Sequence, residues 1–409
     1  MDAAAGGAAA SVRFLGARAD YWRLLTRGAV LLMLTLGIYR FWLTTDVRRF
    51  LWANTEIAGE ALEYTGTALE LLIGFLAAIA LLIPVYAGFF VAALDLGPLG
   101  QVSGVLGFLA LFVLGQFAIY RARRYRLTRT VYRGLRFHQE GSAWGYALRA
   151  VLWWAATLVT LGLAYPFQLA SLERFKMRHT FYGDLAGHFA GSGFGLLLRG
   201  LPMWLLVMGP LVLALGAFVE GVNWTALAEA LGHGGGKEVM ARVEGGNPGL
   251  GGVIVFSLLM VATAVTAAAL LYPVFQALVL RWWSSGLRFG ALEVRSSLRT
   301  AQVYAAYMRF LGWALVFSLA LAVAGIVALV IADRFGEVVV TGVGLIGYVI
   351  AALGYSTIYR ATVMLSLWQL GMELLQLSGL STLDTVKARG QASSPLGEGL
   401  ADALNVGGF

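Results

Sequence analysis

The chain contains six apolar runs, each long enough or nearly long enough to cross a lipid bilayer as a helix. They occupy residues 69–94, 102–120, 200–219, 253–280, 310–332 and 338–359. A helix needs about 20 residues to span about 30 Å of hydrocarbon. The composition agrees, because only 13% of the residues are charged, against about 25% in a soluble domain. The sequence therefore predicts an all-α polytopic membrane protein with six transmembrane helices.

Two further apolar segments do not fit a simple span. Residues 28–39 are uncharged, but as a helix they would extend only about 18 Å. Residues 150–172 are long enough, but Pro166 interrupts them, and proline breaks or kinks a helix. Both segments contain the sequence Thr-Leu-Gly, at 35–37 and 160–162. We predict two re-entrant half-spans, with a full crossing by segment 150–172 as the alternative.

The positions of the basic residues distinguish these topologies. With two half-spans, the outward loops hold only Lys237, Arg242 and Arg334 of the 30 Lys and Arg residues. If segment 150–172 crossed, the Arg-rich stretches 174–199 and 281–309 would face outward, against the positive-inside rule. The excess of Arg over Lys in an Ala- and Gly-rich chain suggests a bacterial source. We therefore expect a multi-pass protein of the bacterial cell inner membrane with both termini cytoplasmic, and we attribute the net charge of +8 to this topology, not to nucleic-acid binding.

A basic and aromatic stretch followed by glycine recurs after the apolar segments. Gly59, Gly134, Gly183 and Gly286 would each be the first residue of a two-residue turn. Glycine adopts the positive φ that a type II′ hairpin turn requires there. We predict small cytoplasmic β-hairpin modules, paired edge to edge beneath the helices. The alternative is an amphipathic interfacial helix that glycine caps.

This internal repeat divides the chain into modules. Residues 1–20 are expected to be a flexible N-terminus. Module 1 (21–140) contains a half-span, a hairpin, a helix pair and a second hairpin. Module 2 (141–300) has the same order with a Gly-rich outer loop at 220–250, and module 3 (301–379) is a helix pair. Residues 380–409 are expected to be a flexible tail.

The sequence shows no constellation of residues typical of catalysis or metal binding. It contains no Cys, which excludes thiolate chemistry, and no Gly-x-Ser-x-Gly elbow. His179 and His188 flank Asp184, but histidines in polar turns are usually solvated or hydrogen-bonded. We therefore expect no enzyme activity, no cofactor and no metal.

The first 75 or so residues carry a recognisable pattern. It consists of Thr35, Gly37, Tyr39, Trp42, Arg49, Asn54, Thr55 and Gly59, followed by residues 64–71. The pattern resembles the YjgN-like family of bacterial inner-membrane proteins, a domain of unknown function. The resemblance implies a multi-pass inner-membrane location and supplies no activity or substrate. Together with Gly134, Gly183 and Gly286, these residues mark the repeated module, and we expect their roles to be mainly structural.

Two functions fit these features. Repeated helix pairs, half-spans and prolines within the spans favour transport or binding of an apolar or amphiphilic small molecule or lipid. The alternative is a membrane scaffold or assembly factor whose Arg-rich modules, such as residues 121–136, dock lipid headgroups or a partner protein. Membrane lipids are the expected partners in either case, and the oligomeric state is left open.

Overall fold

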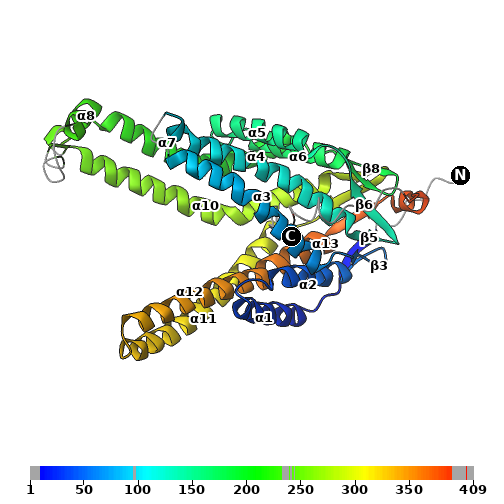
Figure 1. Ribbon diagram of the computed structural model, residues 1–409. Helices are drawn as coiled ribbons and strands as arrows, with labels where there is room; N and C mark the ends of the chain where they lie inside the picture. The colour runs from blue at the N-terminus through cyan, green and yellow to red at the C-terminus, as the bar shows by residue number, and fades with distance from the viewer. Residues whose placement is uncertain are drawn as a thin grey trace.

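Long helices extend from one side of a β-sheet, as Figure 1 shows. The structure is a computed structural model that describes residues 10–94, 98–232, 239, 242–243, 245–388 and 402. The long helices are α3 (Ala68–Leu94), α4 (Pro98–Thr128), α7 (Gly193–Gly221), α10 (Leu250–Gly286), α11 (Thr300–Asp333) and α12 (Glu337–Tyr359). Helix α12 continues through the π-helical turn η1 (Arg360–Met364) into α13 (Leu365–Glu373).

Six helices within the described residues are long and apolar enough to cross a membrane, which confirms the predicted number. Their surfaces carry large exposed hydrophobic side chains, such as Leu319 and Val323 of α11. In water such a surface would be strongly unfavourable, whereas lipid tails solvate it. The length and surface chemistry of these helices define a membrane protein.

Both interrupted apolar segments form the tips of helical hairpins. The first hairpin pairs α1 (Arg18–Leu34) with α2 (Arg40–Ala53), and the second pairs α5 (Ala143–Val159) with α6 (Tyr165–Arg178). The chain reverses direction between the helices of each pair, so segment 150–172 is not one continuous helix. Pro166 lies in the first turn of α6, where the missing N–H costs no intrahelical bond.

The two tips have the same backbone geometry. Leu36 and Gly37 have φ values of 50° and 92°, and Leu161 and Gly162 have 50° and 94°. Thr35 donates its hydroxyl hydrogen to the carbonyl of Leu31, at 2.7 Å, and Thr160 does the same to Ala156, at 2.8 Å. The shared Thr-Leu-Gly sequence thus marks a tight αL reversal, which glycine makes accessible.

The predicted hairpins join into one sheet. In the described residues it has eleven strands in the order β3-β2-β1-β11-β10-β9-β8-β7-β6-β5-β4, and every neighbouring pair is antiparallel. The strands are β1 (Ala10–Phe14), β2 (Thr55–Ile57), β3 (Glu60–Ala61), β4 (Glu63–Tyr64), β5 (Thr130–Tyr132), β6 (Leu135–Gln139), β7 (Thr180–Tyr182), β8 (Leu185–Phe189), β9 (Leu287–Phe289), β10 (Leu292–Ser296) and β11 (Leu375–Ser378). The sheet confirms the hairpin prediction over the amphipathic-helix alternative.

The two terminal strands of this sheet are consecutive in the chain. Only Leu62 separates β3 from β4, and its N–H donates to the carbonyl of Thr55 in β2, at 3.0 Å. The strands therefore form a ring closed by the chain itself, which we call the β-ring.

The turn prediction was partly wrong in its register. Only Gly183 begins its two-residue turn, between Tyr182 and Leu185. Gly59 and Gly134 are the second residues of their turns, after Ala58 and Arg133, and both residues of each turn have positive φ. Two positive φ values are the signature of a type I′ turn, which suits the twist of a hairpin.

Gly286 was assigned wrongly. It ends α10, packed against Phe189, and the turn of that hairpin lies at Gly290 and Ala291. The turn therefore lies four residues later in the chain than the sequence pattern indicated.

Residues 10–14 and 380–385, which belong to the two segments expected to be flexible, form part of the β-ring or pack on it. Residues 10–14 form β1, and a 3₁₀ helix, η2 (Leu380–Thr385), follows β11. Leu380 and Leu383 pack on the cluster of Val12, Leu292, Val294 and Leu377. Apolar burial therefore orders segments that looked polar and small in sequence.

The helices also contact one another in chain order. Each packs on the next, from α1 to α7, then α10, α11 and α12, and α12 packs on α1. Figure 1 shows α11 and α12 leaning away from α3, α4, α7 and α10. The predicted outer loop 220–250 contains a further helix, α8 (Trp224–Gly232); most of its Gly-rich run lies outside the described residues.

Candidate functional site: an apolar pocket beside the second helical hairpin

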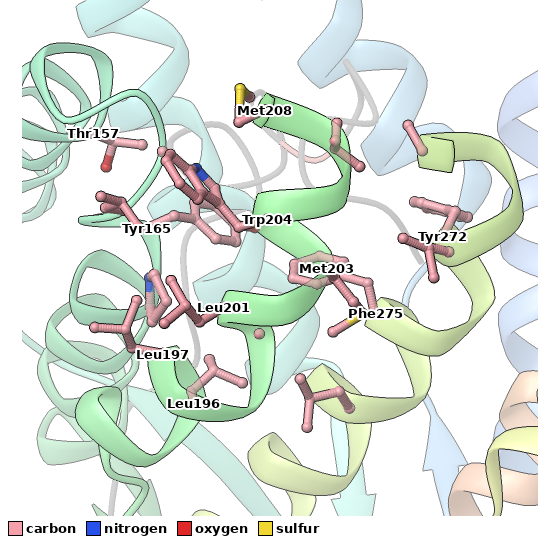
Figure 2. Close-up of a pocket in the computed structure, with 18 residues that line it drawn as sticks. Thr157, Tyr165, Leu196, Leu197, Leu201, Met203, Trp204, Met208, Tyr272 and Phe275 are labelled. Atoms are coloured by element: carbon pink, nitrogen blue, oxygen red, sulfur yellow. The ribbon is translucent and has the colours of Figure 1, made fainter. Parts of the chain in front are cut away.

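An apolar pocket of about 410 Å³ lies where the α5–α6 tip packs against α7 and α10. Figure 2 shows Tyr165 and Trp204 on one side of α7, and Met203 facing Tyr272 and Phe275 of α10. Its volume falls in the usual range of small-molecule sites, roughly 300–1,000 Å³. The pocket has the size and lining expected of a binding site for an apolar group.

Two polar groups of the pocket lining, the Thr157 hydroxyl and the Trp204 indole, bond to the protein itself. The Thr157 hydroxyl donates to the side-chain oxygen of Gln168, at 2.8 Å. The indole N–H of Trp204 donates to the carbonyl of Leu161 in the hairpin tip, at 2.7 Å. Because a buried polar ligand group without a partner costs free energy, this lining favours a hydrocarbon ligand.

Two features of the sequence keep this space open. Gly200 lies on the wall formed by α7, and a Cβ built on it would meet nothing within 4 Å. Pro202 lies inside α7 and Pro273 inside α10, and proline removes a helical hydrogen bond and tends to bend a helix. The proline pattern noted in the sequence therefore flanks the pocket.

The candidate residues of the first module lie away from this pocket. Thr35, Gly37 and Tyr39 build the α1–α2 tip, and the Tyr39 ring stacks on Trp42, with centroids 6.3 Å apart. Arg49 donates to the carbonyl of Gly66, at 3.1 Å. In the structure these residues contact other parts of the protein itself.

Asn54 and Thr55 end α2 and begin β2. The Asn54 amide donates to the carbonyl of Phe50, at 2.7 Å. Thr55 is fully buried and accepts a hydrogen bond from the indole of Trp368, at 3.0 Å. Thr55 thus ties α2 to α13, which are more than 300 residues apart in the chain. Gly59, Gly134 and Gly183 lie in ring turns, and Gly286 lies at the end of α10.

Sequence reasoning missed the inward role of the arginines between residues 121 and 136. Arg123 donates to Gln139 and Thr180, both at 2.8 Å. Arg129 forms a bidentate pair with Glu70 of α3, at 3.0 and 3.1 Å. Arg133 pairs with Asp384 of η2, at 2.9 Å. The cluster of arginines at the end of α4 was visible in the sequence. Their charge alone does not show whether they face outward to dock a partner or inward to pair with other residues of the protein.

These features define a class of protein: a membrane protein of six apolar helices carried on a closed β-ring. The family comparison then places the chain within that class. The chain belongs to the family described as bacterial protein of unknown function (DUF898), whose family model matches residues 9–403. This confirms the resemblance to the YjgN-like family. Comparison with curated proteins and with solved structures gave no match.

Proposed function

We propose that the protein resides in the inner membrane with the β-ring and both termini on the cytoplasmic side. The long helix pairs α3–α4, α7–α10 and α11–α12 then cross and return, and the tips of α1–α2 and α5–α6 enter the bilayer without crossing it. In this orientation the basic residues concentrated near the ring face the cytoplasm, as the positive-inside rule favours. Leu36, at the first tip, is 94% exposed, which suits contact with lipid.

We further infer that the two modules are copies of one structural repeat. Arg49 donates to the carbonyl of Gly66 and Arg174 to that of Gly191, both at 3.1 Å and both 17 residues apart. Thr55 and Thr180 both bond the carbonyl four residues earlier, at 2.7 and 2.8 Å. The same hydrogen bonds recur at the same spacing in both modules. This supports duplication of one unit, a helical hairpin followed by a β-strand.

The function proposed is non-enzymatic binding of the hydrocarbon chain of a lipid or similar amphiphile in the α5–α7–α10 pocket, as one step in its transport. The observation that carries it is the apolar pocket against a hairpin tip, where Thr157 and Trp204 of the lining are already bonded to the protein. Hairpin tips and proline-interrupted helices are typical of transporter binding sites. The scaffold alternative is less well supported, since Arg123, Arg129 and Arg133 contact the protein itself.

Filling the pocket should weaken binding of the hydrocarbon ligand. The variant Gly200→Leu places a side chain into open space, so we expect it to fold and to reduce photo-crosslinking of a diazirine-bearing fatty acid by at least about tenfold, the effect of losing roughly 1.4 kcal/mol of binding free energy. The measurement is peptide mapping of the purified protein after irradiation, with crosslinks expected on α7 and α10.

Gly216→Leu is the matched control, because Gly216 also lies on α7 with open space around its Cα but does not line the pocket. It should crosslink like the unmodified protein. Equal labelling of Gly200→Leu and the unmodified protein would rule out this pocket as the binding site.

A further inference from the structure

A groove of about 520 Å³ lies between α1, α11 and α12. Its lining is aromatic and aliphatic and consists of Trp22, Trp313, Val316, Phe317, Ala320 and Ile358. None of these residues lines the pocket beside α7. From Trp313 to Ala320 the groove follows about two turns of α11, roughly 10 Å, so it has room for part of a hydrocarbon chain.

Two tryptophans lie at the end of the groove nearer the β-ring. Trp22 of α1 and Trp313 of α11 have ring centroids 5.9 Å apart. Tryptophan is enriched at the level of lipid headgroups, because its ring is apolar and its N–H is polar. The pair therefore marks the depth at which the surroundings of the groove change from hydrocarbon to headgroups.

Two arginines lie one helical turn closer to the β-ring than these tryptophans. Arg18 precedes Trp22 by four residues on α1, and Arg309 precedes Trp313 by four residues on α11. Residues at this spacing are neighbours on one helix face. Both helices run away from the ring, after β1 and β10, so the arginines lie between the ring and the groove.

Both arginines bond to neutral acceptors on α13. Arg18 donates to the side-chain oxygen of Gln369, at 2.9 Å, and Arg309 donates to the hydroxyl of Ser366, at 3.1 Å. Ser366 and Gln369 are three residues apart on α13, which places them on neighbouring turns of one face. Helix α13 thus holds two guanidinium groups close together without supplying a countercharge through these bonds.

The charge at this end of the groove is positive. Burial and then the charge of Arg309 lower the pKa of Arg18, whereas Glu373 raises it. Arg360 of η1 adds a positive charge near α1, since it opposes the rise that burial causes in the pKa of Tyr21. The three guanidinium groups and the carboxylate of Glu373 together carry a positive net charge.

We propose that Arg18, Arg309 and the groove bind one anionic phospholipid. Its phosphate lies on the two guanidinium groups, and one acyl chain lies along α11 from Trp313 to Ala320. Arginine matches phosphate oxygens in bidentate geometry, and basic groups at the membrane surface attract anionic lipids. In the orientation proposed above, this lipid belongs to the cytoplasmic leaflet.

The double variant Arg18→Gln/Arg309→Gln of the full-length protein tests the headgroup contact. The protein is placed in phosphatidylcholine nanodiscs that contain phosphatidylglycerol with a diazirine in one acyl chain, and crosslinks are mapped after irradiation. We expect crosslinking to α1 and α11 to fall at least about tenfold, because two charge-assisted hydrogen bonds are lost. A phosphatidylcholine probe with the same diazirine should label the variant and the unmodified protein equally.

Arg23→Gln is the matched control for the charge. Arg23 also lies on α1, but it is exposed, pairs with Asp20 and does not line the groove. The phosphatidylglycerol probe should label this variant like the unmodified protein.

Ala320→Phe tests the acyl-chain contact, because it places a ring in the groove. Ala322→Phe is its control, since Ala322 is also exposed on α11 but does not line the groove. We expect only Ala320→Phe to reduce labelling of α11 by the phosphatidylglycerol probe.

Equal labelling of the unmodified protein, Arg23→Gln and Arg18→Gln/Arg309→Gln by the phosphatidylglycerol probe would overturn the proposal. If the double variant fails to fold, the two phenylalanine variants decide, and equal labelling of both would overturn the proposal as well. Crosslinks here map to α1 and α11, whereas those of the other pocket map to α7 and α10, so the two tests fail separately.

Discussion

Replacing Glu70 with alanine is expected to lower the free energy of unfolding by about 3 kcal/mol, since the change would leave a buried partner charge uncompensated. Glu70 of α3 accepts a hydrogen bond from the hydroxyl of Tyr125, at 2.6 Å, and a bidentate pair of bonds from Arg129. Tyr125 is fully buried and Arg129 nearly so. We call Glu70, Tyr125 and Arg129 the Glu70 clamp. It joins α3 to the end of α4 where these two helices meet the β-ring.

Tryptophan fluorescence during denaturation in mixed micelles measures this effect. Glu63→Ala is the control, because Glu63 is exposed on β4 and its loss should change stability by less than about 0.5 kcal/mol. Similar stabilities for Glu70→Ala and Glu63→Ala would show that the Glu70 clamp does not stabilise the fold.

Replacing Gly379 with alanine is expected to destabilise the β-ring by about 2–5 kcal/mol. Gly379 has φ +79°, and an added Cβ would lie 2.3 Å from the carbonyl oxygen of Ala291. The left-handed conformation costs an alanine about 1–2 kcal/mol, and overpacking adds about 1–3 kcal/mol. The backbone of the β9–β10 turn would have to move, which disturbs the pairing of β10 with β11.

Gly134→Ala separates these two contributions. Gly134 has a similar φ of +73°, but a Cβ there would meet nothing within 4 Å. Its variant should lose only the conformational part, about 1–2 kcal/mol. The readout is the melting temperature of each purified variant, and equal losses would show that the contact with Ala291 is not tight.

The apolar helices and the hairpins were predictable from local sequence, for separate physical reasons. A span of about 20 apolar residues has few alternatives to a membrane helix, and the described part of the chain contains six such helices. The recurring glycine pointed to hairpin turns because only a positive φ closes them. The Thr-Leu-Gly sequences at 35–37 and 160–162 both lie at the tips between paired helices.

The closure of the β-ring and the pocket depended on contacts between distant residues. Strand β1 pairs with β11 across more than 360 residues, and short alternating patterns such as that of Val12 and Phe14 carry little information alone. The turn register at Gly59 and Gly134 depended on which residues paired. Helix packing determined the pocket, since its walls come from α5, α6, α7 and α10.

The same limit explains why the C-terminal region looked like a free tail. Residues 380–385 are small and polar apart from Leu380 and Leu383, and these two side chains find their apolar partners only on the assembled ring. Asp402 gave no local signal either, because its partners Arg48 and Arg126 lie on helices far earlier in the chain.

The central claim is that both helical hairpins and all three long pairs begin and end on a β-ring at the cytoplasmic face. Single cysteines in the Cys-free chain, labelled with a membrane-impermeant maleimide from each side, test it most directly. Glu60→Cys, His188→Cys and Ser381→Cys report on the ring, and Thr225→Cys and Glu337→Cys report on the opposite ends of the helices; all five positions are exposed.

We expect the three ring cysteines to react only from the cytoplasmic side and the other two only from the periplasmic side. Reaction of His188→Cys from the periplasm, with Glu60→Cys still cytoplasmic, would mean that the second hairpin crosses the membrane. The β-ring could not then exist as one closed sheet, and the account would be contradicted.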